Sequence, residues 1–106
     1  MIENLSPKHV KKLLDSGEKI RLIDVREQWE YDIAKIENSE LMPLSEFEKH
    51  APLLQPGEKI ILYCHHGVRS YSACAYLINQ GHENVINLKG GINAWALEID
   101  DTVPVY

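Results

Sequence analysis

The chain has 106 residues, a net charge of −5 at pH 7 and a sequence pI near 5.5. This length suits a single domain over residues 1–106. The acidic balance argues against a nucleic-acid binder, which would need a basic face, and no apolar run is long enough to span a bilayer. We therefore expect neither nucleic acid nor a membrane as a partner.

The beginning of the chain and its cysteine content indicate a reducing compartment. The first residues, MIENLSPKHVKKLL, lack the basic start, apolar core and cleavage site of a signal peptide. The chain has two cysteines, Cys64 and Cys74, whereas a secreted domain stapled by disulfides usually carries more. We predict a cytoplasmic location, where both thiols stay reduced.

The first predicted elements are a helix and a strand. Residues 6–17 begin with Ser6 as an N-cap, continue with a proline and end at Gly17, a pattern that is typical of a helix. Residues 19–25, KIRLIDV, are rich in β-branched and apolar side chains, which favours a short strand.

Three weaker elements follow this strand. Residues 26–34 predict a short helix, with Trp29 and Ile33 four positions apart on its buried side. Residues 40–44 predict a weak strand. Residues 45–54 predict a further helix, which begins at Ser45.

The second half of the chain carries the strongest signals. Residues 58–64, EKIILYC, contain four apolar or aromatic residues in a row, which indicates a strand covered on both faces. A helix is expected over 69–80, a strand over 84–88 and a short helix over 90–97. This alternation predicts an α/β sandwich with a mostly parallel sheet. In such sheets, functional sites gather where strands end and helices begin.

The segment CHHGVR joins the strongest strand directly to a helix. Gly67 allows a positive φ or a close backbone approach, and a short loop at a helix start directs several N–H groups at one spot. These dipoles and the nearby Arg69 favour the thiolate of Cys64 over the thiol. The pattern therefore predicts a nucleophilic cysteine in an anion-binding loop.

Two other interpretations of Cys64 are open at this point. The first is a thiol that packs beneath the end of a strand, since free cysteines are often buried. The second is a metal ligand, but Cys64, His65 and His66 are adjacent, whereas chelating motifs space their ligands by two or more residues. The other histidines are scattered single residues, expected at the surface or as capping residues: His9, His50 and His82.

Residues 63–91 resemble the rhodanese family, the sulfurtransferase homology domains. The matching motifs are CHHGVRS, the helix with AYLINQGHENV, and INLKGGINAW, and the earlier LIDVREQWEY is similar to the first motif of the family. The chain departs from the family at residues 34–36, where Ala-Lys-Ile stands in place of the common Gly-His-Ile. The resemblance implies a five-stranded parallel sheet with helices on both faces, and a persulfide on Cys64.

The resemblance also implies roles for the residues of the loop. The amides of residues 65–69 would surround the persulfide of Cys64, and Arg69, one of three arginines, would bind an anionic donor. The alternative for Arg69 is an ion pair with Asp24 or Glu27. The residues predicted to bind substrate are His65, His66, Gly67, Val68, Arg69 and Ser70.

Four residues are expected to have structural roles around the cysteine loop and in the core. Ser70 is expected to cap the helix, with a hydrogen bond to the sulfur as the alternative. Asp24 and Arg26 are expected to support the loop as a structural pair, as they do in the family. Cys74 shares one helical stripe with apolar residues and is predicted to lie in the core.

The predicted function is that of a sulfurtransferase without metal or organic cofactor. Its donor would be thiosulfate or a protein persulfide, and its acceptor a thiol, a protein or cyanide. One alternative is a phosphatase or arsenate reductase on the same fold, but these enzymes place five residues between cysteine and arginine, and this chain places four between Cys64 and Arg69. The other alternative is a non-catalytic binding module, against which the presence of Cys64 argues.

Overall fold

The computed structural model describes residues 2–106 and contains a five-stranded sheet in the order β1-β5-β4-β2-β3. Every neighbouring pair of strands runs parallel. The strands are β1 (Glu3–Leu5), β2 (Ile20–Asp24), β3 (Glu40–Leu41), β4 (Lys59–Tyr63) and β5 (Val85–Leu88). The helices are α1 (Pro7–Asp15), α2 (Gln28–Ile33), α3 (Phe47–His50), α4 (Val68–Asn79) and α5 (Gly91–Glu98).

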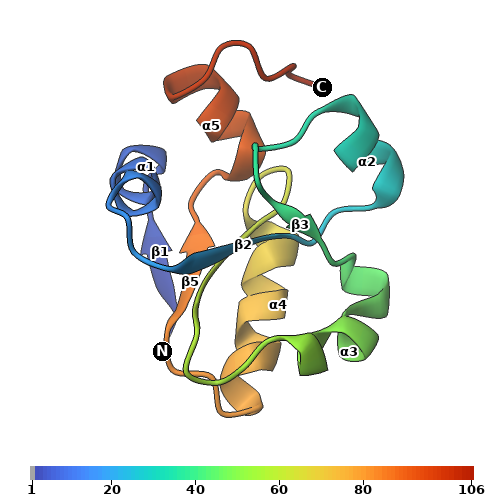
Figure 1. Ribbon diagram of the computed structural model, residues 1–106. Helices are drawn as coiled ribbons and strands as arrows, with labels where there is room; N and C mark the ends of the chain where they lie inside the picture. The colour runs from blue at the N-terminus through green and yellow to red at the C-terminus, as the bar shows by residue number, and fades with distance from the viewer. Residues whose placement is uncertain (1) are drawn as a thin grey trace.

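Helices cover both faces of the sheet, with α1 and α5 on one side and α3 and α4 on the other (Figure 1). Successive side chains of β4 alternate between the two cores: Ile60 and Leu62 pack toward α3 and α4, and Ile61 and Tyr63 toward α1 and α5. All four are fully buried. The predicted α/β sandwich and its parallel sheet are therefore confirmed.

The first strand has no signal in the residue pattern. β1 is three residues long, and its Glu3 and Asn4 are exposed. It forms the edge of the sheet by pairing with β5, which joins Leu5 to Leu88. Such a short edge strand buries too little to leave a periodic pattern of apolar residues, so the sequence elements alone account for four strands.

The buried side of α2 is not the one predicted. Trp29 is 60% exposed and Ile33 is 46% exposed, whereas Glu30 between them is only 3% exposed. The expectation was wrong because a charged side chain takes the inward position, where an arginine neutralises its carboxylate. The helix begins after Glu27, whose side chain forms a capping box with Glu30.

The helix predicted over 45–54 is broken into three short pieces. A 3-10 turn, η1 (Leu44–Glu46), is followed by the single turn of α3 and by a second 3-10 turn, η2 (Ala51–Leu53). Phe47 is buried and anchors the segment. The predicted start at Ser45 is wrong, because η1 begins one residue earlier, at Leu44. The Ser45 hydroxyl donates to the Glu27 carboxylate.

The helix after the cysteine loop is the longest of those described. α4 has 12 residues and begins and ends one residue earlier than predicted. Within residues 2–106, no helix has both the length and the apolar character needed to cross a membrane.

His82 differs from the expected surface histidine. It follows α4, is only 6% exposed, and its Nδ1 has no hydrogen-bond partner. Burial lowers the pKa of His82 below its ordinary value, because the imidazolium would lose its hydration.

We expect the free energy of unfolding to fall as the pH is lowered from 7 to 5. A histidine in the unfolded chain takes up a proton near pH 6.5, whereas buried His82 resists it, so its stabilisation is complete above that pH and is lost below it. The slope is at most about 1.4 kcal/mol per pH unit for this residue. The free energy of unfolding is measured with urea at each pH and plotted against pH. This plot should be less steep for His82→Gln than for wild type, and as steep for His9→Gln as for wild type. Equal slopes in wild type and His82→Gln would contradict the prediction.

Candidate active site

Cys64 lies in the loop between β4 and α4 and is 1% exposed. Gly67 is the N-cap of α4 and has a φ of 103°, a backbone conformation that favours glycine. The turn at Gly67 brings its N–H group to the sulfur, with 3.0 Å between the backbone nitrogen and Cys64 Sγ. A hydrogen bond donated to the sulfur stabilises negative charge on it.

The start of α5 holds the loop from behind. The N–H groups of Ile92 and Asn93 donate to the carbonyls of Cys64 and His65, at 2.9 and 3.1 Å. A Cβ atom at Gly91 would lie 2.5 Å from the Cys64 carbonyl oxygen, so only glycine allows this approach. The carbonyls of Cys64 and His65 are thus bound on this side of the loop, while the N–H of Gly67 faces the sulfur.

Ser70 is the third residue of α4 and does not cap it, so the expected capping role is wrong. Its side chain is fully buried. The hydroxyl oxygen lies 3.4 Å from Cys64 Sγ and 2.5 Å from Oδ1 of Asn87 on β5. The alternative position, beside the sulfur, is the one found.

Arg69 forms an ion pair, but with neither of the carboxylates considered as its alternative partners. Its two terminal nitrogens donate to the two carboxylate oxygens of Glu30, at 2.6 and 2.8 Å. The hydrogen bonds from Arg69 lower the pKa of Glu30 to about 2, and the same contacts raise the pKa of Arg69. The pair therefore stays charged at neutral pH, while the Arg69 side chain remains 37% exposed beside the cysteine loop.

Asp24 and Arg26 form a second ion pair at the end of β2, where both side chains are fully buried. The guanidinium donates to both oxygens of Asp24 and to the backbone carbonyls of Glu30 and Ala34. Burial opposes the charge of Arg26, but its bonds to Asp24 and Tyr106 raise its pKa overall. The predicted pairing of Asp24 with Arg26 is present in the structure.

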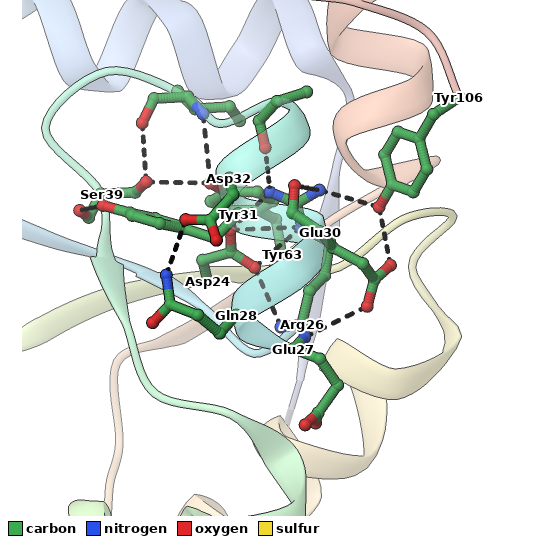
Figure 2. A network of polar contacts seen from close by, with 12 residues as sticks. Asp24, Arg26, Glu27, Gln28, Glu30, Tyr31, Asp32, Ser39, Tyr63 and Tyr106 are labelled. Carbon is green, nitrogen blue, oxygen red and sulfur yellow. Dashed lines mark hydrogen bonds and ion pairs between the residues drawn. The ribbon is translucent and has the colours of Figure 1, made fainter.

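Tyr106 joins the two ion pairs. Its hydroxyl accepts a hydrogen bond from Arg26 at 2.8 Å and donates to Glu30 at 2.7 Å, and Figure 2 shows it between these side chains. The tail that carries Tyr106 ends beside α2 (Figure 1). The Tyr106 ring meets Trp29 edge-on. Residues from three distant parts of the chain are thus tied to one network next to the cysteine loop.

The two histidines of the loop have different surroundings. The His65 ring is stacked on the Tyr106 ring, with a centroid distance of 3.9 Å, and the His66 ring lies 4.0 Å away at an angle of 30°. Burial and the neighbouring His66 lower the pKa of His65, which favours the neutral ring. His66 is exposed, and so is Val68, at 76%. The exposed side chains of the loop are therefore those of residues 66 and 68.

Cys74 lies in the core, as predicted. It is fully buried on α4, and burial raises its pKa to about 12, so that it is a neutral thiol at physiological pH. Among residues 2–106, no group of three or more histidine, cysteine or acidic side chains could hold a metal ion.

Three residues of the site were missed in the sequence. Asn87 had a signal, since it is the one polar residue in an otherwise apolar strand. Glu30 had a weaker signal, the three-residue spacing from Glu27 that is typical of a capping box. Tyr106 had none, because nothing in a short tail shows where its ring will pack.

The fold and the loop define a class: α/β domains with a parallel sheet and a buried cysteine whose sulfur accepts a backbone N–H at the start of a helix. The model of the rhodanese-like domain matches residues 6–98. A sulfurtransferase of Allochromatium vinosum is 32% identical over 96 residues, which are 91% of this chain and 90% of that protein. The chain belongs to the rhodanese-like family.

Two further relatives extend this comparison. The probable adenylyltransferase/sulfurtransferase MoeZ of Mycobacterium tuberculosis is 36% identical over 104 residues, which cover 96% of this chain but only 26% of MoeZ. The crystal structure of a rhodanese-related protein from Thermoplasma volcanium superposes with a TM-score of 0.84 at 27% identity, covering 98% of this chain and 99% of that one. Sulfurtransferase-named relatives support a role in sulfur transfer.

Proposed function

We propose that this protein is a sulfurtransferase that carries sulfane sulfur as a persulfide on Cys64. The donor is thiosulfate or a protein persulfide, and the acceptor is a thiol, a protein sulfur acceptor or cyanide. The observation that carries the proposal is the hydrogen bond of 3.0 Å from the Gly67 N–H to Cys64 Sγ, in a loop closed by an arginine five residues after the cysteine. The proposed location is the cytoplasm, where this thiol would stay reduced.

The reaction divides into two displacements at sulfur. The Cys64 thiolate attacks the outer sulfur of thiosulfate, a new S–S bond forms, and the S–S bond of the donor breaks to release sulfite. The acceptor, as a thiolate or as cyanide, then attacks the outer sulfur of the persulfide and releases the Cys64 thiolate. The N–H of Gly67 stabilises the negative charge at the start and at the end of this cycle.

The size of the loop favours sulfur over phosphate. Four residues separate Cys64 from Arg69. A phosphate ester would need a wider ring of donors around its equatorial oxygens.

Intact mass after incubation with thiosulfate tests the proposal. We expect the mass to increase by one sulfur atom, the addition to be removed by a reductant, and the same protein to form thiocyanate from cyanide. Hydrolysis of an aryl phosphate should be negligible. A protein that gains no sulfur from either thiosulfate or a persulfide donor and hydrolyses the phosphate ester would establish the alternative enzyme. One that gains no sulfur from either donor and hydrolyses no phosphate ester would be a binding module.

We expect Arg69→Ala to slow loading from thiosulfate by roughly ten- to a hundred-fold, which corresponds to the loss of one charge-assisted contact. Discharge of a persulfide that is already formed should change little, because the proposed role of Arg69 is only to bind the anionic donor. Arg69→Lys should restore part of the loading, since an ammonium keeps the charge but not the planar fork. Loading and discharge are followed separately by mass.

The matched control for Arg69→Ala also removes the carboxylate of Glu30, which loses its partner in that variant. Arg69→Ala leaves Glu30 buried without its cation, so this variant should also be less stable. The double variant Glu30→Gln/Arg69→Ala should regain stability in urea without regaining the loading rate. Recovery of loading together with stability would show that Arg69 has a structural role only.

A further inference from the structure

Asn87 is a buried amide directly beneath the cysteine loop. It lies on β5 and is 3% exposed. Its side chain contacts Gly67, Ser70 and Asn4, which belong to the loop, to α4 and to β1. It is therefore the point at which three elements meet next to Cys64.

The contacts of Asn87 fix which way its amide faces. Nδ2 lies 3.1 Å from the Gly67 carbonyl oxygen, which can only accept a hydrogen bond, and 2.8 Å from Oδ1 of Asn4. Both protons of the amide are used in these two contacts. Oδ1 of Asn87 must then face Ser70, and across the 2.5 Å between them the Ser70 hydroxyl is the donor.

This assignment decides what Ser70 can offer the sulfur. The hydroxyl oxygen is 3.4 Å from Cys64 Sγ, but a serine has one proton, and that proton is directed at Asn87. Ser70 therefore presents a lone pair to the sulfur. A lone pair accepts a hydrogen bond from the thiol and repels the thiolate. Turning the hydroxyl to the sulfur would leave the buried Oδ1 of Asn87 unpaired, which is unfavourable.

We propose that Asn87 is a positioning residue that acts through Ser70 to limit the ionisation of Cys64. Asn87 holds the Ser70 hydroxyl as an acceptor for the Cys64 thiol, which favours the protonated sulfur. The N–H of Gly67 has the opposite effect, because it favours the thiolate. The consequence is that Asn87, through Ser70, weakens the preference for the thiolate that the N–H of Gly67 creates. This inference rests on the proposed function in one respect, the assignment of Cys64 as the nucleophile.

Other charged groups surround the loop, and none of them is altered in the variants of Asn87, Asn4 and Ser70 that test the proposal. The titratable and charged side chains on the elements that pack around it are His65, His66, Arg69, Cys74, Glu30, Asp24, Lys89 and Tyr106. They set the starting ionisation of the sulfur in every variant alike. Only differences between the variants test the role of Asn87.

The experiment measures the rate of alkylation of Cys64 by iodoacetamide between pH 5 and 10, with the modified residue identified by peptide mass. In Asn87→Leu the Ser70 hydroxyl is free to donate to the sulfur, and we expect the midpoint of the pH profile to fall by about half to one pH unit, a three- to ten-fold rise in the ionisation constant. Asn87→Val lacks the same acceptor and should behave alike, which keeps the test open if Asn87→Leu does not fold. Asn4→Ala, which leaves Ser70 bound, should not shift the profile.

The decisive comparison repeats Asn87→Leu in the Ser70→Ala background. If Asn87 acts through Ser70, the double variant has the same midpoint as Ser70→Ala alone. A shift of equal size in both backgrounds would overturn the proposal and assign the effect to the released Gly67 carbonyl. An unchanged or higher midpoint in the single variants would overturn it as well.

Failure of this inference can be told apart from failure of the proposed function. Alkylation requires the thiolate of Cys64 but no sulfur donor. A protein that gains no sulfur from thiosulfate or from a persulfide donor and still shows the Ser70-dependent shift would refute the proposed function alone. A protein that gains sulfur and shows no shift would refute the role of Asn87 alone.

Discussion

Cys64→Ser is expected to abolish sulfur transfer, leaving only the uncatalysed rate. A serine hydroxyl is not ionised near neutral pH and cannot hold sulfane sulfur, so neither loading nor discharge can occur. The fold should survive, because oxygen is smaller than sulfur and the hydrogen bond from Gly67 can be accepted by it. The measurement is intact mass after incubation with thiosulfate, together with thiocyanate formation from cyanide.

The matched control is Cys74→Ser, the other cysteine of the chain. Cys74 is fully buried on α4 and is a neutral thiol, so its loss should cost some stability but leave loading nearly unchanged. Equal loading of wild type and Cys64→Ser would refute the assignment of the nucleophile. If Cys74→Ser is fully folded and does not load sulfur, Cys74 takes part in the reaction.

Asp24→Asn is expected to lower the free energy of unfolding by about 3–5 kcal/mol, the usual cost of leaving a buried charge unpaired. Both side chains of the Asp24–Arg26 pair are fully buried, so no water can replace the lost carboxylate. The change would remove a large part of the stability of a typical small domain. Urea unfolding followed by circular dichroism measures it.

An exposed ion pair of the same protein provides the comparison. Glu40 pairs with Arg21 at 2.7 Å, but its side chain is 45% exposed. Glu40→Gln should therefore cost no more than about 1 kcal/mol, because solvent screens the exposed pair. If the two substitutions destabilise the protein equally, burial does not determine the strength of the Asp24–Arg26 pair.

The residue pattern was sufficient for the elements whose apolar side chains are buried on both faces of the sheet. Residues 58–64 predicted β4 because an unbroken apolar run suits a strand between two layers of helices. Residues 6–17 predicted α1 because its cap and its proline act locally, and Ser6 does accept a hydrogen bond from the His9 amide. Local chemistry also placed Gly67 and Cys64 in the turn that brings them together.

The pattern failed where a polar side chain is buried by a partner that is distant in the sequence. Glu30 takes the inward position of α2 because Arg69, 39 residues later, neutralises it. The buried face of that helix therefore could not be predicted from the period of Trp29 and Ile33. β1 was missed for a related reason, since its place is set by hydrogen bonds to β5 and not by burial of its own side chains.

The sequence by itself determined the α/β layering, the loop that holds Cys64 and the four-residue spacing to Arg69. These features depend on apolar periodicity and on backbone conformations that a few neighbouring residues dictate. Only the tertiary structure decided the partners of the polar groups: Glu30 for Arg69, Tyr106 between the two ion pairs, and Asn87 for the proton of Ser70. A hydrogen bond joins groups that meet in space, and residues separated by as many as 83 positions are brought together only when the sheet and its helices have packed.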